Sequence, residues 1–182
     1  MTTRAAYRHD LMAEDLVLLL IAAEGPDGDA GRLNGITRLE KLLFLADKET
    51  NVSTAVNQPF SFRPYDYGPY SKAVYEAVDL LEQAGLLREE RVLEGASLDE
   101  LEEDFAAGSD VREGIERRFL LTDAGRQVAD LLKARNPRES ADLMRIKQQY
   151  SSLPLRTLIR LVYRKYPDFA KASKIRSEIL DD

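Results

Sequence analysis

Residues 117–126 read RRFLLTDAGR, and this stretch decides the fold class. Ile115, Arg117, Phe119 and Leu121 alternate with Glu116, Arg118 and Leu120, the period of two that is typical of a strand. Thr122 stands directly before a helical pattern, where a threonine side chain accepts hydrogen bonds from free backbone N–H groups. We therefore predict a strand over residues 115–121 and a helix over residues 123–134.

A second strand and the helix before it are expected upstream. Apolar residues recur at helical spacing from Ser71 to Ala84, and Gly85 stands where a helix C-terminal glycine would. The segment EQAGLLRE, residues 82–89, leads from that glycine into a strand over residues 86–93. The two strands predict a hairpin with a long acidic tip, residues 94–114. Within this tip a capping box at Ser97 and Glu100 predicts a helix over residues 97–105.

Two further helices are expected nearer the start of the chain. Residues 10–23 are almost wholly apolar in their second half, which predicts a central helix buried on most sides. TRLE, residues 37–40, matches a capping box, so a helix should run from Thr37 to Lys48. Its bases, Arg38, Lys41 and Lys48, are expected away from the apolar face.

The loop between those two helices does not predict a phosphate-binding site. Residues 25–35 read GPDGDAGRLNG and contain four glycines. No Lys followed by Ser or Thr comes after the last glycine, and no strand is expected before the first, so the pattern of a phosphate-binding loop is incomplete.

The most unusual stretch is FSFRPYDYGPYS, residues 60–71, with five aromatic residues and two prolines. Pro69 after Gly68 is expected at a first helical position, which makes a rigid, tyrosine-rich helix start. Tyrosine offers contact area at a low cost in rotamer entropy. The candidate partner-binding residues are Tyr65, Asp66, Tyr67, Tyr70, Lys72 and Tyr75. The alternative is a set of core aromatics with locally satisfied hydroxyls, and Asp66 as a turn residue.

The C-terminal third is expected to be helical over residues 141–150, 154–166 and 172–180. Arg156, Arg160 and Arg164 recur at intervals of four, so they predict one exposed basic stripe. This stripe could contact nucleic acid or an acidic partner. Alternatively it is a solvated helix face, or it pairs with the acidic hairpin.

Charge divides the chain into two parts. Residues 93–116 hold nine acidic residues and one base, whereas residues 126–176 hold thirteen bases and four acids. The predicted fold class is mainly α with a small β-hairpin (α+β). We expect a winged-helix-like core over residues 1–135, with an acidic hairpin insertion at 94–114, and a basic helical C-terminal extension over residues 136–182 packed on the core.

The strand and wing segments EQAGLLRE and RRFLLTDAGR resemble those of bacterial winged helix-turn-helix proteins. The pair TRLEKLLFLAD, residues 37–47, and YDYGPYSKAVYEAVDLLEQAGLL, residues 65–87, is more particular. It resembles SocA-like antitoxins with a Panacea domain and the related YwgA-type uncharacterised proteins. The resemblance covers about residues 36–125 and implies a winged-helix-like core and a toxin-like protein partner. The chain departs from the antitoxins in its long acidic hairpin and its basic C-terminal third.

Composition argues against an enzyme. The chain has no cysteine and a single histidine, His9, so neither a thiolate nucleophile nor a histidine-based triad or zinc site can be built. We expect no catalytic residue, no cofactor and no metal. The longest apolar run is too short to span a bilayer and the first residues lack a signal-peptide pattern, so a cytoplasmic location without a membrane partner is expected.

These observations predict a non-catalytic, protein-binding regulatory module, antitoxin-like or an adaptor, that uses the tyrosine-rich helix start as its contact surface. A toxin-like protein or a second copy of the chain is the expected partner, with a homodimer as the simplest assembly. The alternative is a winged-helix transcription regulator that binds DNA through residues 70–75, although the wing is the most acidic part of the chain.

Overall fold

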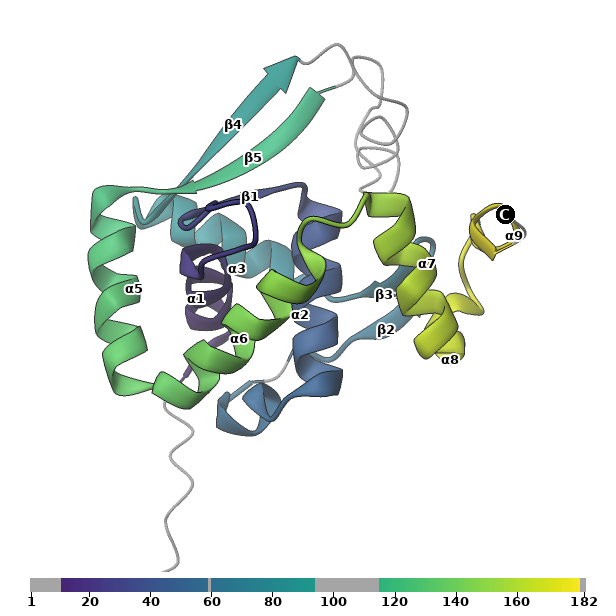
Figure 1. Ribbon diagram of the computed structural model, residues 1–182, viewed down its shortest axis with the longest axis horizontal. Helices are drawn as coiled ribbons and strands as arrows, with labels where there is room; N and C mark the ends of the chain where they lie inside the picture. Colours follow the sequence, from purple (N-terminus) through teal and green to yellow (C-terminus); the bar gives the residue numbers. More distant parts are fainter. Residues whose placement is uncertain (1–10, 59, 94–114, 181–182) are drawn as a thin grey trace, which may run out of the picture.

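The computed structural model describes residues 11–58, 60–93 and 115–180 (Figure 1). The helices are α1 (Ala13–Ala22), α2 (Ile36–Glu49), α3 (Lys72–Gln83), α5 (Asp123–Arg135), α6 (Pro137–Tyr150), α7 (Leu155–Lys165), α8 (Pro167–Ala170) and α9 (Arg176–Leu180), with a 3₁₀ turn η1 (Val52–Ala55). The strands are β1 (Arg32–Asn34), β2 (Arg63–Tyr65), β3 (Gly68–Tyr70), β4 (Leu87–Leu93) and β5 (Ile115–Leu121). The predicted fold class, mainly α with a small antiparallel sheet, is confirmed. His9 and the helix predicted over residues 97–105 lie outside the described residues.

The wing forms as the sequence predicted. β4 pairs antiparallel with β5 from Leu87 opposite Leu121 to Leu93 opposite Ile115, and Figure 1 shows both strands projecting from the helical body. Thr122 caps α5, because its Oγ1 accepts a hydrogen bond from Gly125 N at 3.0 Å. Gly85 follows α3 with a φ of 70°, the left-handed conformation that ends many helices.

A third strand, β1, completes the sheet in the order β1-β5-β4. It is three residues long and lies within the stretch that was expected to be only a loop. Leu33 of β1 is buried opposite Phe119, and Gly35 N donates to Arg117 O at 2.8 Å. Leaving aside the segment between α2 and α3, the order α1, β1, α2, α3, β4, β5 and the sheet order β1-β5-β4 follow the pattern expected of a winged-helix-like core.

The connection between α2 and α3 differs from a helix-turn-helix. That motif uses a turn of about three or four residues, whereas residues 50–71 separate these two helices. The segment contains η1 and a second hairpin, in which β2 pairs with β3. Pro69 lies opposite Pro64 in this hairpin, so its expected position in the first turn of α3 was wrong. The helix begins at Lys72, after Ser71 as its N-terminal cap residue.

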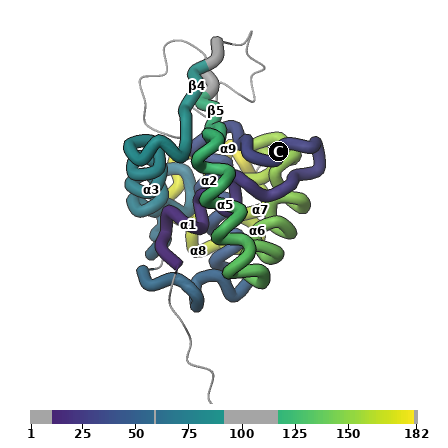
Figure 2. Tube along the Cα trace, turned by 90° about the vertical axis from the view of Figure 1, so that its left-hand side faces the viewer, coloured from purple at the N-terminus to yellow at the C-terminus, as the bar shows by residue number. Residues whose placement is uncertain are grey.

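Helix α1 is the centre of the core, as predicted. Every residue from Leu16 to Ile21 is buried. Figure 2 shows α3 on one side of α1 and α6 on the other, and α1 also contacts α2 and α5. No helix in the described part of the chain is long and apolar enough to cross a membrane.

The C-terminal helices pack on the first half of the chain. α6 contacts both α1 and α2, and α7 packs on α2. Near α8, Phe44 of α2 lies edge-on to Phe62, Tyr166 and Phe169, with ring centroids between 4.8 and 5.3 Å away. This cluster joins α2, the residues that precede β2, and the C-terminal helices.

Lys147 of α6 is fully buried and ties several segments together. Its Nζ lies within hydrogen-bond distance, 2.9–3.1 Å, of four backbone carbonyl oxygens, those of Ile21, Ala23, Asp29 and Arg32, which share its three N–H donors. Two of these oxygens belong to the end of α1, where carbonyls lack helical partners. Burial lowers the pKa of Lys147, and the Asp29 carboxylate, 3.7 Å from Nζ, opposes that shift. We call these four oxygens the carbonyl cage.

Lys147→Met keeps a long apolar side chain but leaves the carbonyl cage without its donor. We expect the free energy of unfolding to fall by about 3–5 kcal/mol, measured by urea denaturation followed by circular dichroism. Arg145→Met, at an exposed position of the same helix, is the matched control and should change stability by less than about 1 kcal/mol. Equal losses in the two variants would show that the carbonyl cage does not stabilise the fold.

Candidate functional site

The second hairpin and the first turns of α3 form one row of tyrosines. Tyr65 of β2 and Tyr70 of β3 have ring centroids 5.0 Å apart, and Tyr70 lies 5.5 Å from Tyr75 of α3. Both pairs are tilted by 38°. We call Tyr65, Tyr70 and Tyr75 the tyrosine row. The Arg63 guanidinium lies 5.6 Å from the Tyr65 centroid and 5.4 Å from that of Tyr70, a cation–π geometry.

A buried ion pair lies behind the tyrosine row. Lys41 Nζ donates to Glu40 Oε2 at 2.8 Å and to the Pro69 carbonyl oxygen at 2.9 Å. Ser71 N donates to Glu40 Oε1 at 3.0 Å, and the Ser71 hydroxyl donates to the Phe60 carbonyl oxygen. Glu40 and Lys41 are 3% and 1% exposed, so a charge pair between them depends on these additional hydrogen bonds. Through them α2 holds the hairpin and the start of α3.

This pair corrects two expectations about α2. Glu40 does not complete a capping box with Thr37, because its carboxylate accepts from Ser71, and Gly35 is the cap residue. Lys41, expected on the solvent side, is buried because its ammonium group reaches the carbonyl of Pro69. Both differences arise because residues of the following hairpin compete for these side chains.

All six residues predicted to bind a partner line one open cavity of about 480 Å³. The cavity, which we call the tyrosine pocket, also contains the buried ion pair and the acidic face of α3. Its lining consists of Glu40, Lys41, Tyr65, Asp66, Tyr67, Gly68, Pro69, Tyr70, Lys72, Tyr75, Glu76 and Asp79. The structure thus brings together residues that the sequence spreads over forty positions.

The charged groups of the tyrosine pocket are mostly paired. Asp66 pairs with Lys174, and Lys72 pairs with Glu76 at 2.6 Å. The pKa of Tyr75 is raised by burial and by the nearby Glu40 carboxylate, so its hydroxyl stays protonated. Among the described residues no hydrogen-bond partner reaches the hydroxyls of Tyr65, Tyr67, Tyr70 or Tyr75. Tyr65 is exposed and Tyr67, Tyr70 and Tyr75 are half-buried, with the Tyr75 ring packed against the core.

The C-terminal helices and the segment between α8 and α9 pack against the second hairpin. Gly68 packs directly on the ring of Tyr163 of α7, which is 1% exposed and whose hydroxyl lies 2.7 Å from Ser173 Oγ. Lys174 N donates to the Asp66 carbonyl oxygen at 2.8 Å. The C-terminal extension, residues 136–182, therefore helps to position the tyrosine pocket. No sequence pattern in these residues predicted that role.

The exposed stripe expected on α7 does not form. Arg156 donates to the Glu178 carbonyl oxygen at 2.9 Å, and Arg160 donates to that of Ile179 at 2.7 Å. Both arginines are half-buried against α9, whereas Arg164 is exposed. The spacing of four correctly placed the arginines on one face of α7. The short helix α9 covers part of that face, and the packing of α9 there could not be predicted from the sequence.

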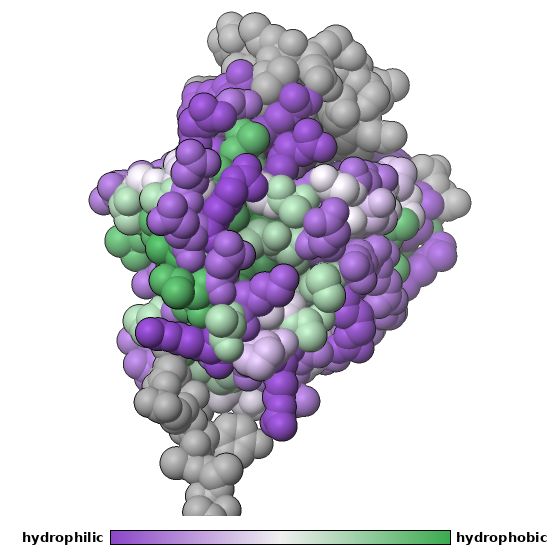
Figure 3. Space-filling view, turned by 60° about the vertical axis from the view of Figure 1, so that its left-hand side comes forward, coloured by the Kyte–Doolittle hydropathy of each residue, from purple (hydrophilic) through white to green (hydrophobic). Residues whose placement is uncertain are grey.

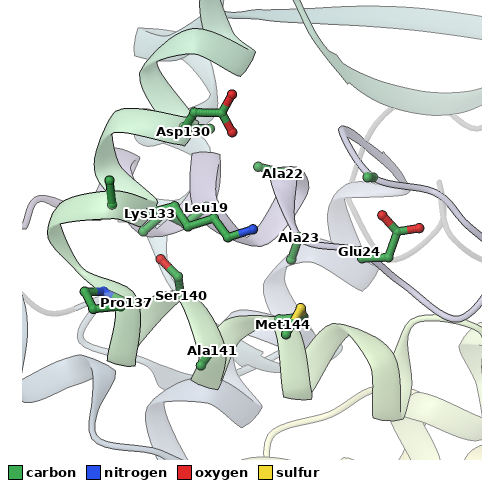
Figure 4. A pocket seen from close by; sticks show the side chains of 13 residues that line it. Leu19, Ala22, Ala23, Glu24, Asp130, Lys133, Pro137, Ser140, Ala141 and Met144 are labelled. Carbon is green, nitrogen blue, oxygen red and sulfur yellow. The ribbon is translucent and has the colours of Figure 1, made fainter.

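A second cavity, of about 630 Å³, lies between α1, α5 and α6 and was not predicted. Figure 4 shows Leu19 and Met144 with small side chains around them, the Lys133 side chain reaching across the pocket, and Asp130 and Glu24 nearer its edges. In the space-filling view the face that α5 crosses shows pale and deeper green apolar surface among hydrophilic side chains (Figure 3). The Ser140 hydroxyl is buried, and no described residue provides it with a hydrogen bond. Six alanines and one serine line much of this cavity, and their spacing in the sequence forms no motif from which a binding site could be predicted.

Fold and pocket together define a mainly helical protein with a small antiparallel sheet, in which a tyrosine-bearing hairpin lies between α2 and α3. A scan of protein-family models, a search of curated proteins and a search of solved structures each find no match to this chain. Within the described ranges no group of three or more His, Asp or Glu side chains is arranged to hold a metal ion.

Gly68→Ala tests how the hairpin is seated. The new Cβ would lie 2.6 Å from Tyr163 Cε1, at a φ of 94° that disfavours alanine. We expect unfolding free energy to fall by about 2–4 kcal/mol. At Gly85 the φ is 70° but nothing lies within 4 Å, so Gly85→Ala should cost only about 1 kcal/mol. A smaller loss at Gly68 than at Gly85, by chemical denaturation, would contradict this packing.

Alkaline pH tests the burial of Tyr163. Burial raises the pKa of its hydroxyl to about 12, and the hydrogen bond with Ser173 lowers it by less. Because an unfolded tyrosine titrates near pH 10, the unfolded chain loses this proton first. The contribution of the buried phenol is therefore fully present below about pH 10 and is lost as the pH approaches about 12.

We expect wild-type protein to lose about 2–3 kcal/mol more stability than Tyr163→Phe between about pH 9 and pH 12. Urea denaturation at each pH measures the difference, and the other tyrosines cancel because both proteins contain them. Parallel pH profiles would mean that the Tyr163 hydroxyl titrates as it does in water.

Proposed function

We propose that this protein is a non-catalytic, protein-binding regulatory module, antitoxin-like or an adaptor, and that the tyrosine pocket is its contact surface. One observation carries the proposal: four tyrosines, whose hydroxyls have no hydrogen-bond partner among the described residues, meet in one open cavity on a hydrogen-bonded hairpin. Tyrosine side chains anchor interfaces because they bury a large ring and still offer a hydrogen bond. The resemblance of residues 36–125 to SocA-like antitoxins favours a toxin-like protein or a second copy of the chain as partner.

Rigidity of the support favours recognition. The hairpin is held on one side by the buried pair of Glu40 and Lys41 and on the other by Tyr163 and Lys174. A surface that is already ordered loses little conformational entropy when a partner binds. The tyrosine pocket therefore has the organisation expected of a preformed docking site.

The alternative, a DNA-binding regulator, is less well supported. The exposed positions of α3, the helix that would enter the major groove, include Glu76 and Asp79, and its one base, Lys72, pairs with Glu76. In the described part of the wing, Arg88 pairs with Glu90, and both Arg91 and Arg117 pair with Glu89. Carboxylates at these positions would repel phosphates, and the paired arginines would have to break their ion pairs.

The function is tested by comparing partner binding of wild type, Tyr65→Ala, and Tyr67→Ala combined with Tyr70→Ala. Light scattering over a concentration series first measures self-association, and quantitative affinity capture from a lysate then measures other partners. We expect the tyrosine variants to reduce the captured or self-associated fraction by about tenfold or more. Tyr65 is 46% exposed, so its removal should leave the melting temperature nearly unchanged.

Leu131→Ala is the matched control, because Leu131 of α5 is 62% exposed and lies outside the tyrosine pocket. It should bind partners as wild type does. Binding that survives the tyrosine changes, or a wild type that is monomeric and captures nothing above background, would refute the proposed function. A duplex-DNA titration completes the test: a steep, sequence-specific salt dependence would favour the regulator instead.

A further inference from the structure

The tyrosine pocket combines aromatic faces with hydroxyls that no other described residue engages in a hydrogen bond. Tyr65, Tyr67, Tyr70 and Tyr75 all contribute to its lining. The face of an aromatic ring carries negative potential and attracts cations, and phenolic oxygens accept hydrogen bonds from N–H groups. Such walls favour a planar organic cation over an anion or a purely apolar group.

The chain itself supplies a guanidinium to these rings. Arg63 lies within 5.6 Å of the centroids of Tyr65 and Tyr70 and does not line the cavity. A guanidinium is planar and weakly hydrated, so it stacks on tyrosine more readily than the compact ammonium of lysine. The same rings can therefore accept a second guanidinium from the cavity side.

Among the residues that the structure describes, one carboxylate of the cavity, that of Asp79, has no counter-charge. Glu40, Asp66 and Glu76 are paired with Lys41, Lys174 and Lys72 respectively. Asp79 also lines the cavity, and no cation of the described residues lies within ion-pair distance of it. Because Asp79 follows Tyr75 by four positions, both side chains lie on one face of α3.

We propose that the tyrosine pocket receives the side chain of an arginine from the protein partner, with the guanidinium stacked on the tyrosine row and paired with Asp79. The proposal rests on the proposed function and names the chemistry of its partner. A volume of about 480 Å³ accommodates an arginine side chain together with flanking backbone.

The test uses four capped tripeptides, acetyl-Gly-X-Gly-amide, with arginine, citrulline, lysine or glutamate as X. Citrulline has nearly the same shape as arginine but no charge. Binding is followed by the ring ¹H–¹³C signals of protein labelled at tyrosine. We expect the arginine peptide to bind with a Kd in the millimolar range, about fivefold more tightly than the lysine peptide. Its binding should shift the ring signals of the tyrosine row, which are assigned by their loss in Tyr65→Leu and Tyr70→Leu. The citrulline and glutamate peptides should leave these signals unmoved.

Asp79→Asn should lower the affinity for the arginine peptide by about fivefold or more. Asp130→Asn is the matched control, because Asp130 is an exposed aspartate of α5 outside the tyrosine pocket, and it should leave this affinity unchanged. Lys72→Gln should strengthen binding, because it removes a competing positive charge. Citrulline binding as tightly as arginine, lysine matching arginine, or an Asp79→Asn variant indistinguishable from wild type would each overturn the guanidinium assignment.

The two proposals fail separately. If partner capture depends on the tyrosines but the arginine peptide does not bind, the contact surface stands and the guanidinium assignment is wrong. If partner capture is unaffected by the tyrosine changes, the proposed function is wrong, whatever the peptides do.

Discussion

The buried pair of Glu40 and Lys41 constrains how the second hairpin and the start of α3 lie against α2. Two adjacent charges inside a protein are costly unless their remaining hydrogen bonds are made. Here those bonds go to Ser71 N and to the Pro69 carbonyl oxygen, so the pair is satisfied only when the second hairpin lies against α2. The need to complete these hydrogen bonds therefore sets both the position of β3 and the start of α3.

The C-terminal extension completes this arrangement from the other side. Tyr163 lies under Gly68, Lys174 pairs with Asp66, and Lys147 holds the end of α1 and the loop that leads to β1. Several basic residues of this extension, among them Lys147, Lys174 and Arg160, therefore bind backbone carbonyls or carboxylates within the molecule. This explains why a chain with a strongly basic third does not present that charge as one continuous patch on α7.

The sequence predicted an element correctly when the interactions that form it are local, and it failed when the element depends on hydrogen bonds to a distant segment. The wing strands, the cap at Thr122 and the helix end at Gly85 were predictable, because alternation, capping and a left-handed glycine are local signals. β1 was not, since three residues become a strand only by pairing with β5. Pro69 carried a helix-start signal, but pairing of β3 with β2 placed it in a strand.

The sequence alone predicted a mainly helical fold with a small antiparallel sheet, and unusual residue types drew attention to six positions in and just after the tyrosine-rich stretch. Docking of the helices then placed these six residues in one cavity, placed Asp79 there with no described cation within ion-pair distance, and turned Arg156 and Arg160 toward α9. The reason is physical: a side chain's burial and partners depend on segments distant in the chain, and these are fixed only when the helices dock.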